Sequence, residues 1–567
     1  MISDALDSRR QTGAGYLLDG PGAALEGLVP PDRRADAADA WRRHARALCD
    51  ALGWTDAPLV VREFPRGLSL ALGSPVDLLY TATDLNEAAW AATRAELAGA
   101  SPEPRNAVIA RLRASADDEA DVALAALIAE AERRAVPLVW DDDAITVGLG
   151  ARGQTFAPDA LPDPAALDWD AVSAIPTALI TGTNGKSTTT RILAGMGRAA
   201  GHTVGFSTTD AVTVGDHVVE RGDFSGPLGA RAVMRDERVT LAICESARGG
   251  LLRRGVPVPI VAAAALTNVA ADHLGDYGVE TVAALADAKL VVAKALAAGG
   301  TLVAPADEPP ARAAVLRQRE GLLARGVRIA WTALDPAADA PDGLAATVHD
   351  GQISLRSDDG WRAVCPVDAI PAALGGAAKH VVRNGLTAAS LATALGLSDD
   401  AIAAGLRAFK SDASDNPGRA NRFEVDGATV VVDYAHNAHG LAALADLADH
   451  WDATRRLVLF GSAGDRSDDD IAAMADGLAR LRPDRVVLVD VPGYLRGRER
   501  GDVPALLLRL LGERGIPTDA CTVLADPVAG TRFALDWLAP GDLAILLALA
   551  QRDQVLALVR EAEASHA

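Results

Sequence analysis

The stretch Thr181–Thr188, with the sequence TGTNGKST, contains the residue types and spacing that a phosphate-binding loop needs. It follows a short apolar run, Thr177–Ile180, that predicts a buried strand, and it precedes a helix predicted over Thr189–Ala200. A glycine-bearing turn there directs backbone N–H groups at an anion, while a lysine adds charge and a hydroxyl can hold Mg²⁺. The predicted nucleotide-phosphate ligands are Thr183, Asn184, Gly185, Lys186, Ser187 and Thr188.

The spacing of this loop departs from the usual P-loop at one position. The pattern G-x-x-x-x-G-K-[ST] requires a glycine at position 180, which is Ile180 here, so the chain carries the shorter form G-T-N-G-K-S. A chance match to the shorter form is not rare in a chain with 52 glycines. Its place between a strand and a helix nevertheless favours a nucleoside triphosphate site.

Two further polar residues follow predicted strands of the same sheet. Glu245 ends the run that begins at Leu241, and His273 follows the run that ends at Asn268. Because the carboxyl ends of parallel strands meet at one edge, where ligands bind, Glu245 is predicted to hold Mg²⁺ and His273 a second divalent ion. The alternatives are a helix cap or surface charge for Glu245 and a structural role for His273.

Lysine is scarce in this chain. Of the 55 lysines and arginines, only residues 186, 289, 294, 379 and 410 are lysines. Arginine serves equally well as a surface cation, whereas lysine can lose its proton and can be modified. Lys289, in a helix predicted over Val279–Ala297, is therefore a candidate for chemistry that arginine cannot perform. The alternative is a solvated helix lysine.

A polar cluster also follows a predicted strand in the last third of the chain. The block N-P-G-R ends at Arg419, and the apolar run 430–432 leads into Asp433, His436 and Asn437. Asp433 is suited to ribose hydroxyls and the other two to a base, while Arg419 is suited to charge that develops on a triphosphate. The alternative is that these are turn and cap residues.

The composition narrows the class of function. A net charge of −21 argues against binding to nucleic acid or to an anionic membrane surface. The four cysteines are scattered without a C-x-x-C pair, so no zinc site or disulfide framework is predicted, and the expected compartment is the cytoplasm. No signal segment and no membrane-spanning apolar run is visible. The oligomeric state stays open.

The pattern of strands and helices predicts an α/β chain of three domains. Residues 1–170 have an α/β pattern without a chemical motif and are predicted to recognise substrate. Residues 171–412 alternate strands and helices, as in a parallel sheet covered on both faces, with a β insertion around Asp350-Gly351. Residues 413–567 form a third, Rossmann-like unit.

Taken together and in order, the blocks resemble the Mur ligase superfamily and, within it, the Mur-like half of the cyanophycin synthetases. The resemblance covers roughly Ile175 to Arg560, about two-thirds of the chain. The E-S-A-R-G-G-L-L-R and G-D-x-x-G-P blocks favour the cyanophycin synthetase branch over the cell-wall enzymes. The blocks stand at 181–189, 208–210, 222–227, 245–253, 267–275, 416–419, 433–437, 495–498 and 540–543.

The resemblance implies an N-terminal α/β domain, a central P-loop ATPase-type sheet with a small β insertion, and a C-terminal Rossmann-like ligase domain. It also implies an ATP-dependent amide ligase. A substrate carboxylate takes the γ-phosphoryl group of ATP to give an acyl phosphate and ADP, and an amine then displaces phosphate. The substrates would be small amino acids or peptides.

The resemblance also implies roles for individual residues. Lys186 and its loop hold the β- and γ-phosphates, Ser187 and Glu245 bind one Mg²⁺, and His273 helps to bind a second. Lys289 matches the region where many of these ligases carry a carbamylated lysine, a carboxylate-like metal ligand. The remaining ATP contacts fall on Asn384, at the adenine side, and on Arg419, Asp433, His436 and Asn437 of the C-terminal domain. Catalytic roles fall on Lys186, Glu245, His273, Lys289 and Arg419.

Two departures from the family pattern stand out. Ala438 replaces a common proline, for which only small loop changes are expected. Cyanophycin synthetases also carry an ATP-grasp half before the Mur-like half, and this chain is expected to lack it, together with the activity that extends the aspartate backbone. The Mur-like half of those enzymes joins arginine to an aspartate side chain. Whether this chain uses that pair is open.

Other functions compete with a single-addition ligase. One is a polyglutamate-type ligase that extends a chain. Another is a non-catalytic nucleotide-binding subunit, against which the intact Lys186, Ser187, Glu245 and His273 argue. A P-loop GTPase or kinase fits poorly, because the third domain carries its own nucleotide-contact motif.

Overall fold

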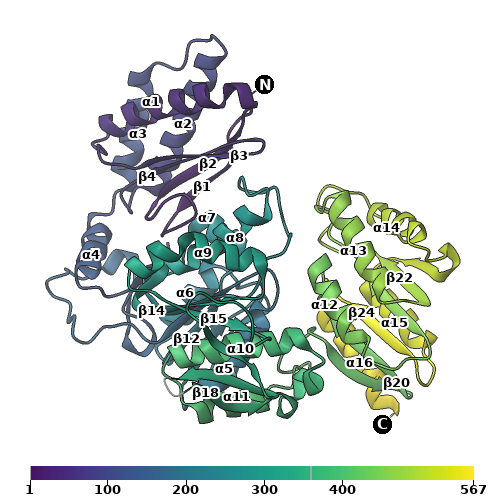
Figure 1. The fold of residues 1–567 in the computed structure, drawn as a ribbon. Coiled ribbons are helices and arrows are strands. Elements are labelled where there is room, and N and C mark those ends of the chain that lie inside the picture. Colours follow the sequence, from purple (N-terminus) through teal and green to yellow (C-terminus); the bar gives the residue numbers. More distant parts are fainter. Residues whose placement is uncertain (1, 358–359, 567) are drawn as a thin grey trace. The chain divides into compact units, whose positions relative to one another are not determined.

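The computed structural model describes residues 2–357 and 360–566 (Figure 1). It divides into two compact units, which do not follow the chain as simple halves. The first comprises the chain up to Ala270, Leu274–Val364 and Asn384–Gly405; the second comprises Ala271–His273, Cys365–Arg383 and the chain from Leu406 onward. The three-domain division at 170/171 and 412/413 stays a prediction.

The N-terminal part of the first unit is an antiparallel sheet, in the order β1-β2-β4-β3, packed against helices. Trp41 and Trp90 are fully buried in its core. The Trp41 indole N–H donates to Asn86 Oδ1 at 3.0 Å, so burial of the ring leaves no donor unsatisfied. The elements are β1 (Leu6–Gln11), β2 (Gly22–Leu28), α1 (Arg34–Ala51), β3 (Leu59–Phe64), β4 (Gly67–Gly73), α2 (Leu79–Leu97) and α3 (Arg105–Glu119).

A second, smaller sheet follows, in the order β5-β6-β7. Asp141, which lies just after β5, pairs with Arg231 at 3.1 Å and with Arg235 at 2.8 Å, and so joins this sheet to α6 (Pro227–Arg235). The elements are α4 (Val122–Arg133), β5 (Leu138–Trp140), β6 (Ile145–Val147) and β7 (Gln154–Phe156).

The largest sheet has 11 strands, in the order β11-β10-β9-β12-β8-β13-β14-β15-β16-β17-β18. The strands from β9 to β16 in this order run parallel, and antiparallel strands continue the sheet at both edges. Its strands are β8 (Thr177–Thr181), β9 (Val204–Ser207), β10 (Ala211–Val214), β11 (His217–Arg221), β12 (Leu241–Glu245), β13 (Val261–Leu266), β14 (Leu296–Pro305), β15 (Arg328–Ala333), β16 (Leu344–His349), β17 (Gln352–Ser357) and β18 (Gly360–Pro366).

Helices α5 to α9 lie between strands of this sheet along the chain, and α10 and α11 follow its last strand, β18. They are α5 (Lys186–Ala199), α6, α7 (Arg248–Arg254), α8 (Val282–Leu290), α9 (Pro309–Ala324), α10 (Lys379–Ala394) and α11 (Asp399–Ala408). The helix predicted over Val279–Ala297 is shorter than expected: α8 ends at Leu290, a 3₁₀ turn follows, and β14 begins at Leu296. A continuous apolar run has no periodicity that separates a buried helix from a buried strand, so its end was misplaced.

The predicted hairpin at Asp350-Gly351 is present, with both residues in the left-handed region at φ of 49° and 72°. The predicted β insertion joins the large sheet, because β16 pairs in parallel with β15. The two strands of the hairpin and the turn between them were predictable from residues close together in the chain. The pairing of β16 with β15 was not, because it joins residues on separate segments.

The sheet of the second unit has the order β19-β20-β24-β21-β22-β23. The connections through α12, α13 and α14 step in one direction, and α15 returns the chain to β24, so right-handed crossovers place α15 on the opposite face. The elements are β19 (Asn421–Val425), β20 (Ala428–Asp433), α12 (Ala438–Ala448), β21 (Arg456–Phe460), α13 (Asp468–Arg480), β22 (Arg485–Val489), α14 (Asp502–Glu513), β23 (Cys521–Leu524), α15 (Pro527–Trp537), β24 (Leu543–Leu547) and α16 (Arg552–His566). None of the described helices combines the length and apolarity needed to cross a membrane.

A buried ion pair within the N-terminal sheet holds the arginine that binds α7. The Arg9 guanidinium contacts both carboxylate oxygens of Glu26, at 2.5 and 3.0 Å, and its Nε donates to the Leu252 carbonyl at 2.9 Å. Burial raises the pKa of Glu26, and the charge of Arg9 opposes that shift. The bidentate contact with Glu26 therefore fixes the Arg9 guanidinium, whose Nε binds β1 to the helix that follows Glu245.

Replacing Arg9 by leucine is expected to lower the free energy of unfolding by about 3–5 kcal/mol, because the Glu26 carboxylate would stay buried without its partner. Urea denaturation measures this change. The control is Arg42→Leu, which breaks an exposed pair with Asp39 and should cost less than about 1 kcal/mol. Equal midpoints for the two variants would show that the buried pair does not stabilise this junction.

Candidate active site

The register of three parallel strands brings the predicted phosphate loop and its partners to one edge of the large sheet. Glu245, the last residue of β12, lies beside Ile180 of β8, and Leu266, the last residue of β13, lies beside Thr181. The loops that follow β12, β8 and β13 therefore begin at the same edge of the sheet. This is the edge of a parallel sheet at which ligands bind.

The loop after β8 depends on two glycines. Gly182 has φ of +150° and Gly185 has φ of +83°, values that residues with a Cβ rarely adopt. A Cβ on Gly182 would lie 1.8 Å from Thr267 Oγ1, and one on Gly185 would lie 2.4 Å from Asn384 Oδ1. The loop thus has room for backbone only. Its helix, α5, begins at Lys186, so the helix N-terminus follows the second glycine directly.

Hydrogen bonds hold this loop against the segment after β13. The Thr183 N–H donates to the Asn268 carbonyl at 2.9 Å, and the Asn184 N–H donates to Asn268 Oδ1 at 3.0 Å. The Thr267 hydroxyl donates to the Asn184 carbonyl at 2.6 Å. Thr183 Oγ1 accepts the Ala270 N–H at 3.0 Å. Residues 267–270, the start of the block at 267–275, therefore shape the loop.

Lys186, Ser187 and Glu245 lie in contact with one another. The Ser187 hydroxyl donates to Glu245 Oε2 at 2.7 Å, and Lys186 Nζ lies 3.8 Å from Glu245 Oε1. Lys186 Nζ also donates to the Thr183 carbonyl at 3.1 Å. Glu245 is 1% exposed, so its carboxylate needs partners of this kind. The cluster joins a cation, a hydroxyl and a carboxylate within one loop region.

Thr209 belongs to this cluster but was not predicted as a site residue. Its hydroxyl lies 3.0 Å from Ser187 Oγ, and its backbone N–H lies 3.3 Å from Glu245 Oε2. The signal available in the sequence was the T-T-D block at 208–210. Its contact with Ser187 follows from β9 pairing with β12, which the sequence does not reveal.

Lys289 and Asn384 both reach the loop from helices far along the chain. Lys289 is 4% exposed, and its Nζ donates to the Gly182 carbonyl at 2.8 Å. The interpretation as a solvated helix lysine is therefore wrong. Asn384, on α10, lies against Gly185 and is 6% exposed. Both side chains contact the two glycines on which the loop conformation depends.

The C-terminal candidates gather around β20 in the second unit. Asp433 accepts the backbone N–H groups of Ala420 and Ala435, each at 2.7 Å, so it orders the turns on both sides. The Arg419 guanidinium lies 4.3 Å from the centre of the Tyr434 ring. Asn437 caps α12 by accepting the Gly440 N–H at 2.8 Å. The cap and turn roles considered for Asp433 and Asn437 are therefore present, and nucleotide roles stay predictions.

His273 lies in the second unit, beside Asp272 and Arg466. Its backbone has φ of +50°, in the left-handed region, and its Nε2 lies 3.2 Å from Arg466 Nη2. Arg466 Nη1 lies 2.6 Å from Asp272 Oδ1, and both side chains are largely buried. Arg466 was missed, because a single arginine in G-D-R-S carries no motif. Binding of a second metal ion by His273 stays a prediction.

The electrostatics of this group follow from its burial. Burial alone would raise the pKa of Asp272, but His436, Arg466 and His273 together outweigh it and lower that pKa to about 2. Burial also lowers the pKa of His436, whose Nδ1–H donates to the Tyr434 carbonyl at 2.9 Å. A lowered pKa leaves His436 mostly neutral at pH 7, whereas arginine stays protonated. Arg466 therefore supplies the positive charge beside Asp272 at that pH.

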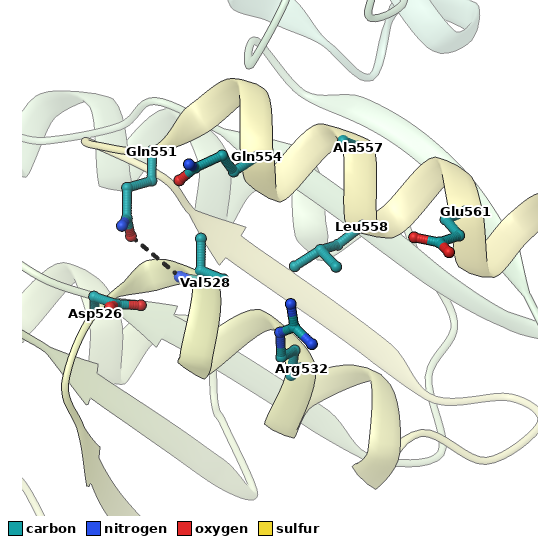
Figure 2. Close-up of a pocket in the computed structure, with 8 residues that line it drawn as sticks. All are labelled: Asp526, Val528, Arg532, Gln551, Gln554, Ala557, Leu558 and Glu561. Atoms are coloured by element: carbon teal, nitrogen blue, oxygen red, sulfur yellow. Dashed lines mark hydrogen bonds between the residues drawn. The ribbon is translucent and has the colours of Figure 1, made fainter.

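The described part of the chain also contains a pocket of about 360 Å³ between α15 and α16 (Figure 2). None of the predicted site residues lines it. In Figure 2, Arg532 points into the space between the two helices, with Asp526 and Glu561 toward its ends. The lining residues are Asp526, Val528, Arg532, Gln551, Gln554, Ala557, Leu558 and Glu561.

Family models match both parts of the chain that carry candidate residues. Residues 180–391 match the Mur ligase middle domain, and residues 418–548 match the Mur ligase, glutamate ligase domain. The chain belongs to the Mur ligase family. The two matches cover the phosphate loop, Glu245, Lys289 and Asn384 in one domain and Arg419 to Asn437 in the other.

Relatives of this Mur ligase include cyanophycin synthetases. That of Crocosphaera subtropica is 34% identical over 380 residues, which cover 66% of this chain and 42% of the relative. That of Trichormus variabilis is 34% identical over 341 residues, or 59% of this chain and 37% of the relative. The chain thus matches less than half the length of these relatives. The UDP-N-acetylmuramoyl-L-alanyl-D-glutamate–2,6-diaminopimelate ligase of Geobacter metallireducens is 26% identical over 67% of this chain and 74% of its own length.

Solved structures also resemble the chain. MurF from Acinetobacter baumannii aligns with a TM-score of 0.49 at 16% identity, over 68% of this chain and 77% of that one. E. coli FolC in complex with DHPP and ADP aligns with a TM-score of 0.49 at 19% identity, over 69% of this chain and 89% of that one.

Replacing Arg466 by methionine is expected to destabilise the second unit by about 3–5 kcal/mol at pH 7, because Asp272 would keep a buried charge without its cation. The native pKa of Asp272 lies below its unfolded value, so its stabilisation is present above that value and is lost as the pH falls toward 2. The difference between wild type and variant should therefore shrink at pH 3. Hydrogen exchange of peptides from β20 to β22 measures it.

The matched control is Arg482→Met, which removes an exposed ion pair with Asp449 in the same unit. It should change protection by less than about 1 kcal/mol at either pH. A loss in Arg466→Met that is the same at pH 7 and pH 3 would contradict the electrostatic explanation.

Proposed function

We propose that this Mur ligase uses ATP to activate a carboxylate as an acyl phosphate and joins it to the amine of an amino acid or another small molecule. The carboxylate partner is an amino acid or peptide. The observation that carries the proposal is the contact of Lys186 and Ser187, at the start of α5, with Glu245 at the end of β12. A lysine, a hydroxyl and a carboxylate so arranged suit a triphosphate with its metal ion. The printed names of the relatives, synthetases and ligases, support this class.

The loop suits a triphosphate because the N-terminus of α5, with its backbone N–H groups, follows it at Lys186, and because Gly182 and Gly185 add no side-chain bulk. Lys186 would hold the β- and γ-phosphates, with its ammonium already directed over the loop at the Thr183 carbonyl. Thr188 follows on the first turn of α5 and is largely buried. A loop bound tightly to residues 267–270 needs little reorganisation when phosphate binds, which favours affinity.

Oxygen donors at Ser187 and Glu245 fit Mg²⁺, which binds proteins through one or two carboxylates and keeps several waters. No group of three or more His, Cys, Asp and Glu side chains suited to a metal ion occurs in the described residues. Phosphate and water would therefore supply the other ligands of an ion at this place, and Mg²⁺ bound here would neutralise charge on the phosphates. Thr209 would keep the Ser187 hydroxyl aimed at Glu245.

The reaction has two bond exchanges. A carboxylate oxygen of the acceptor attacks the γ-phosphorus of ATP, and the bond from that phosphorus to the bridging oxygen of ADP breaks. The amine nitrogen then attacks the acyl carbon, the bond to phosphate breaks, and the nitrogen loses a proton. Lys186 stabilises negative charge in the first exchange. Burial of Ser187 and Glu245 limits water, which would otherwise hydrolyse the acyl phosphate.

We assign the other candidates supporting roles. Lys289 fixes the carbonyl of Gly182 and is the residue proposed to be carbamylated, a modification that its buried place next to the loop would protect. Asn384 borders the loop at Gly185 and is proposed to face adenine. His273 is proposed to bind a second metal ion. Arg419, Asp433, His436 and Asn437 are proposed to bind ATP, with Arg419 acting in catalysis.

Replacing Lys186 by alanine is expected to reduce turnover by at least about a hundredfold, because it removes the charge that stabilises the transferred phosphoryl group. The measurement is release of ADP and phosphate across a panel of acceptors and amines. Turnover in wild type should require ATP, an acceptor carboxylate and an amine together. Product masses separate single addition from a ladder of chain extension. ATP binding without turnover for any pair would contradict the ligase and favour a nucleotide-binding subunit.

Replacing Gly185 by alanine is expected to weaken ATP binding by at least about tenfold, because the new Cβ would displace Asn384 and fill the cradle. Gly201→Ala is the matched control: its φ of +86° gives a similar backbone strain, about 1–2 kcal/mol, but nothing lies within 4 Å of its Cβ. Isothermal titration with a non-hydrolysable ATP analogue tests this. Equal losses in both variants would mean that backbone strain alone is responsible.

A further inference from the structure

Three arginines gather where the N-terminal sheet packs against α7. Arg253 and Arg254 form the last turn of α7, and Arg10 lies on β1, which contacts that helix. Arg254 Nη1 donates to the Arg10 carbonyl at 2.9 Å, and the Arg254 carbonyl accepts the Thr12 N–H at 3.0 Å. Strand β1 and the end of α7 are thus bound to each other, and all three arginines lie where these two elements meet.

These guanidinium groups lack the partners that neighbouring arginines have. In the described part of the chain, no carboxylate lies within ion-pair distance of Arg10, Arg253 or Arg254. The adjacent Arg9 pairs with Glu26, and Arg248 of the same helix pairs with Asp276 at 2.7 Å. In a chain with 76 acidic residues and a net charge of −21, three clustered arginines without a carboxylate are unusual.

The environment of the three arginines suits an anion. The Arg10 guanidinium stacks on the Tyr80 ring at 3.7 Å, which leaves its N–H edge available, and Tyr80 is 53% exposed. Burial lowers the pKa of Arg254, and the charges of Arg10, Arg253 and Arg231 lower it further. The fold thus keeps mutually repelling charges close together. The negative end of the helix dipole favours cations such as Arg253 and Arg254 at the C-terminus of α7. It does not explain Arg10, which lies on β1.

The position of this cluster relates it to the predicted reaction. The helix α7 begins at Arg248, three residues after Glu245, and its seven residues span about 10 Å. An acceptor whose reacting carboxylate lies near Glu245 could therefore extend along α7 to the arginines. The N-terminal sheet supplies Arg10 and Tyr80 to this end, which gives that sheet a part in substrate recognition.

We propose that Arg10, Arg253 and Arg254 bind a second anionic group of the acceptor, a carboxylate or a phosphate, about the length of α7 away from the reacting carboxylate. The acceptor class is therefore a molecule with at least two separated anionic groups. The inference rests on the proposed ligase for the place of the reacting carboxylate. Binding of an anion at the arginines does not depend on ATP or turnover, so the two claims can fail separately.

The test is equilibrium binding of a fluorescein-labelled penta-glutamate peptide, followed by anisotropy at low salt and without ATP. All variants carry Lys186→Ala, so that the phosphate loop contributes little. Arg10→Gln with Arg253→Gln is expected to raise the Kd at least tenfold, since removing one charge-assisted hydrogen bond costs about tenfold, or ~1.4 kcal/mol. The control is Arg328→Gln with Arg221→Gln, two exposed arginines without an ion pair in the described structure, which removes the same charge. It should change the Kd less than twofold.

Competition identifies the anion. Displacement of the labelled peptide by inorganic phosphate as well as by unlabelled penta-glutamate indicates a site that accepts phosphate, whereas displacement by the peptide alone indicates a carboxylate site. Either result supports the proposal when the Arg10 and Arg253 variant binds weakly. Equal affinity in that variant and the control, or no binding to the Lys186→Ala protein, would overturn it.

Discussion

The register of β12, β8 and β13 is the constraint on which the candidate site depends. Because Glu245 lies beside Ile180 and Leu266 lies beside Thr181, three chain segments leave the sheet at one level. The loop after β8 then turns through Gly182 and Gly185, which only glycine allows without displacing Thr267 or Asn384. Lys186 and Ser187 start a helix directly over Glu245 as a result. A shift of one residue between these strands would separate the lysine, the hydroxyl and the carboxylate.

The same sheet edge explains why distant side chains converge. Lys289 reaches Gly182 from α8, Thr209 reaches Ser187 from the end of β9, and Asn384 reaches Gly185 from α10. Each contacts the loop or the residue that follows it. The loop is therefore held from several elements, as expected for a site that must bind phosphate with little rearrangement. On the far side of Glu245, α7 connects the same edge to the N-terminal sheet through Arg9 and Leu252.

Local patterns in the sequence predicted the loop at 181–188, the strand-end carboxylate Glu245 and the hairpin turn at Asp350-Gly351, because each depends on residues close together in the chain. Contacts between distant residues were not predictable from one sequence. Thr209 needed the pairing of β9 with β12, Arg466 needed its approach to Asp272, and Arg9 needed its approach to Leu252. The end of α8 was misplaced because Val291 and Val292 continue an apolar run that suits helix and strand alike. His273 lies beside Asp272 and Arg466 in the second unit, and its role at the metal site stays a prediction.

The central claim is that the acceptor carboxylate takes up the γ-phosphoryl group of ATP before the amine reacts. The most direct measurement uses an acceptor labelled with ¹⁸O in its carboxylate and follows the label by mass spectrometry of the products. An acyl phosphate requires that one ¹⁸O atom per turnover appear in inorganic phosphate, with the other retained in the amide. Phosphate without ¹⁸O, formed in step with the amide, would contradict the account.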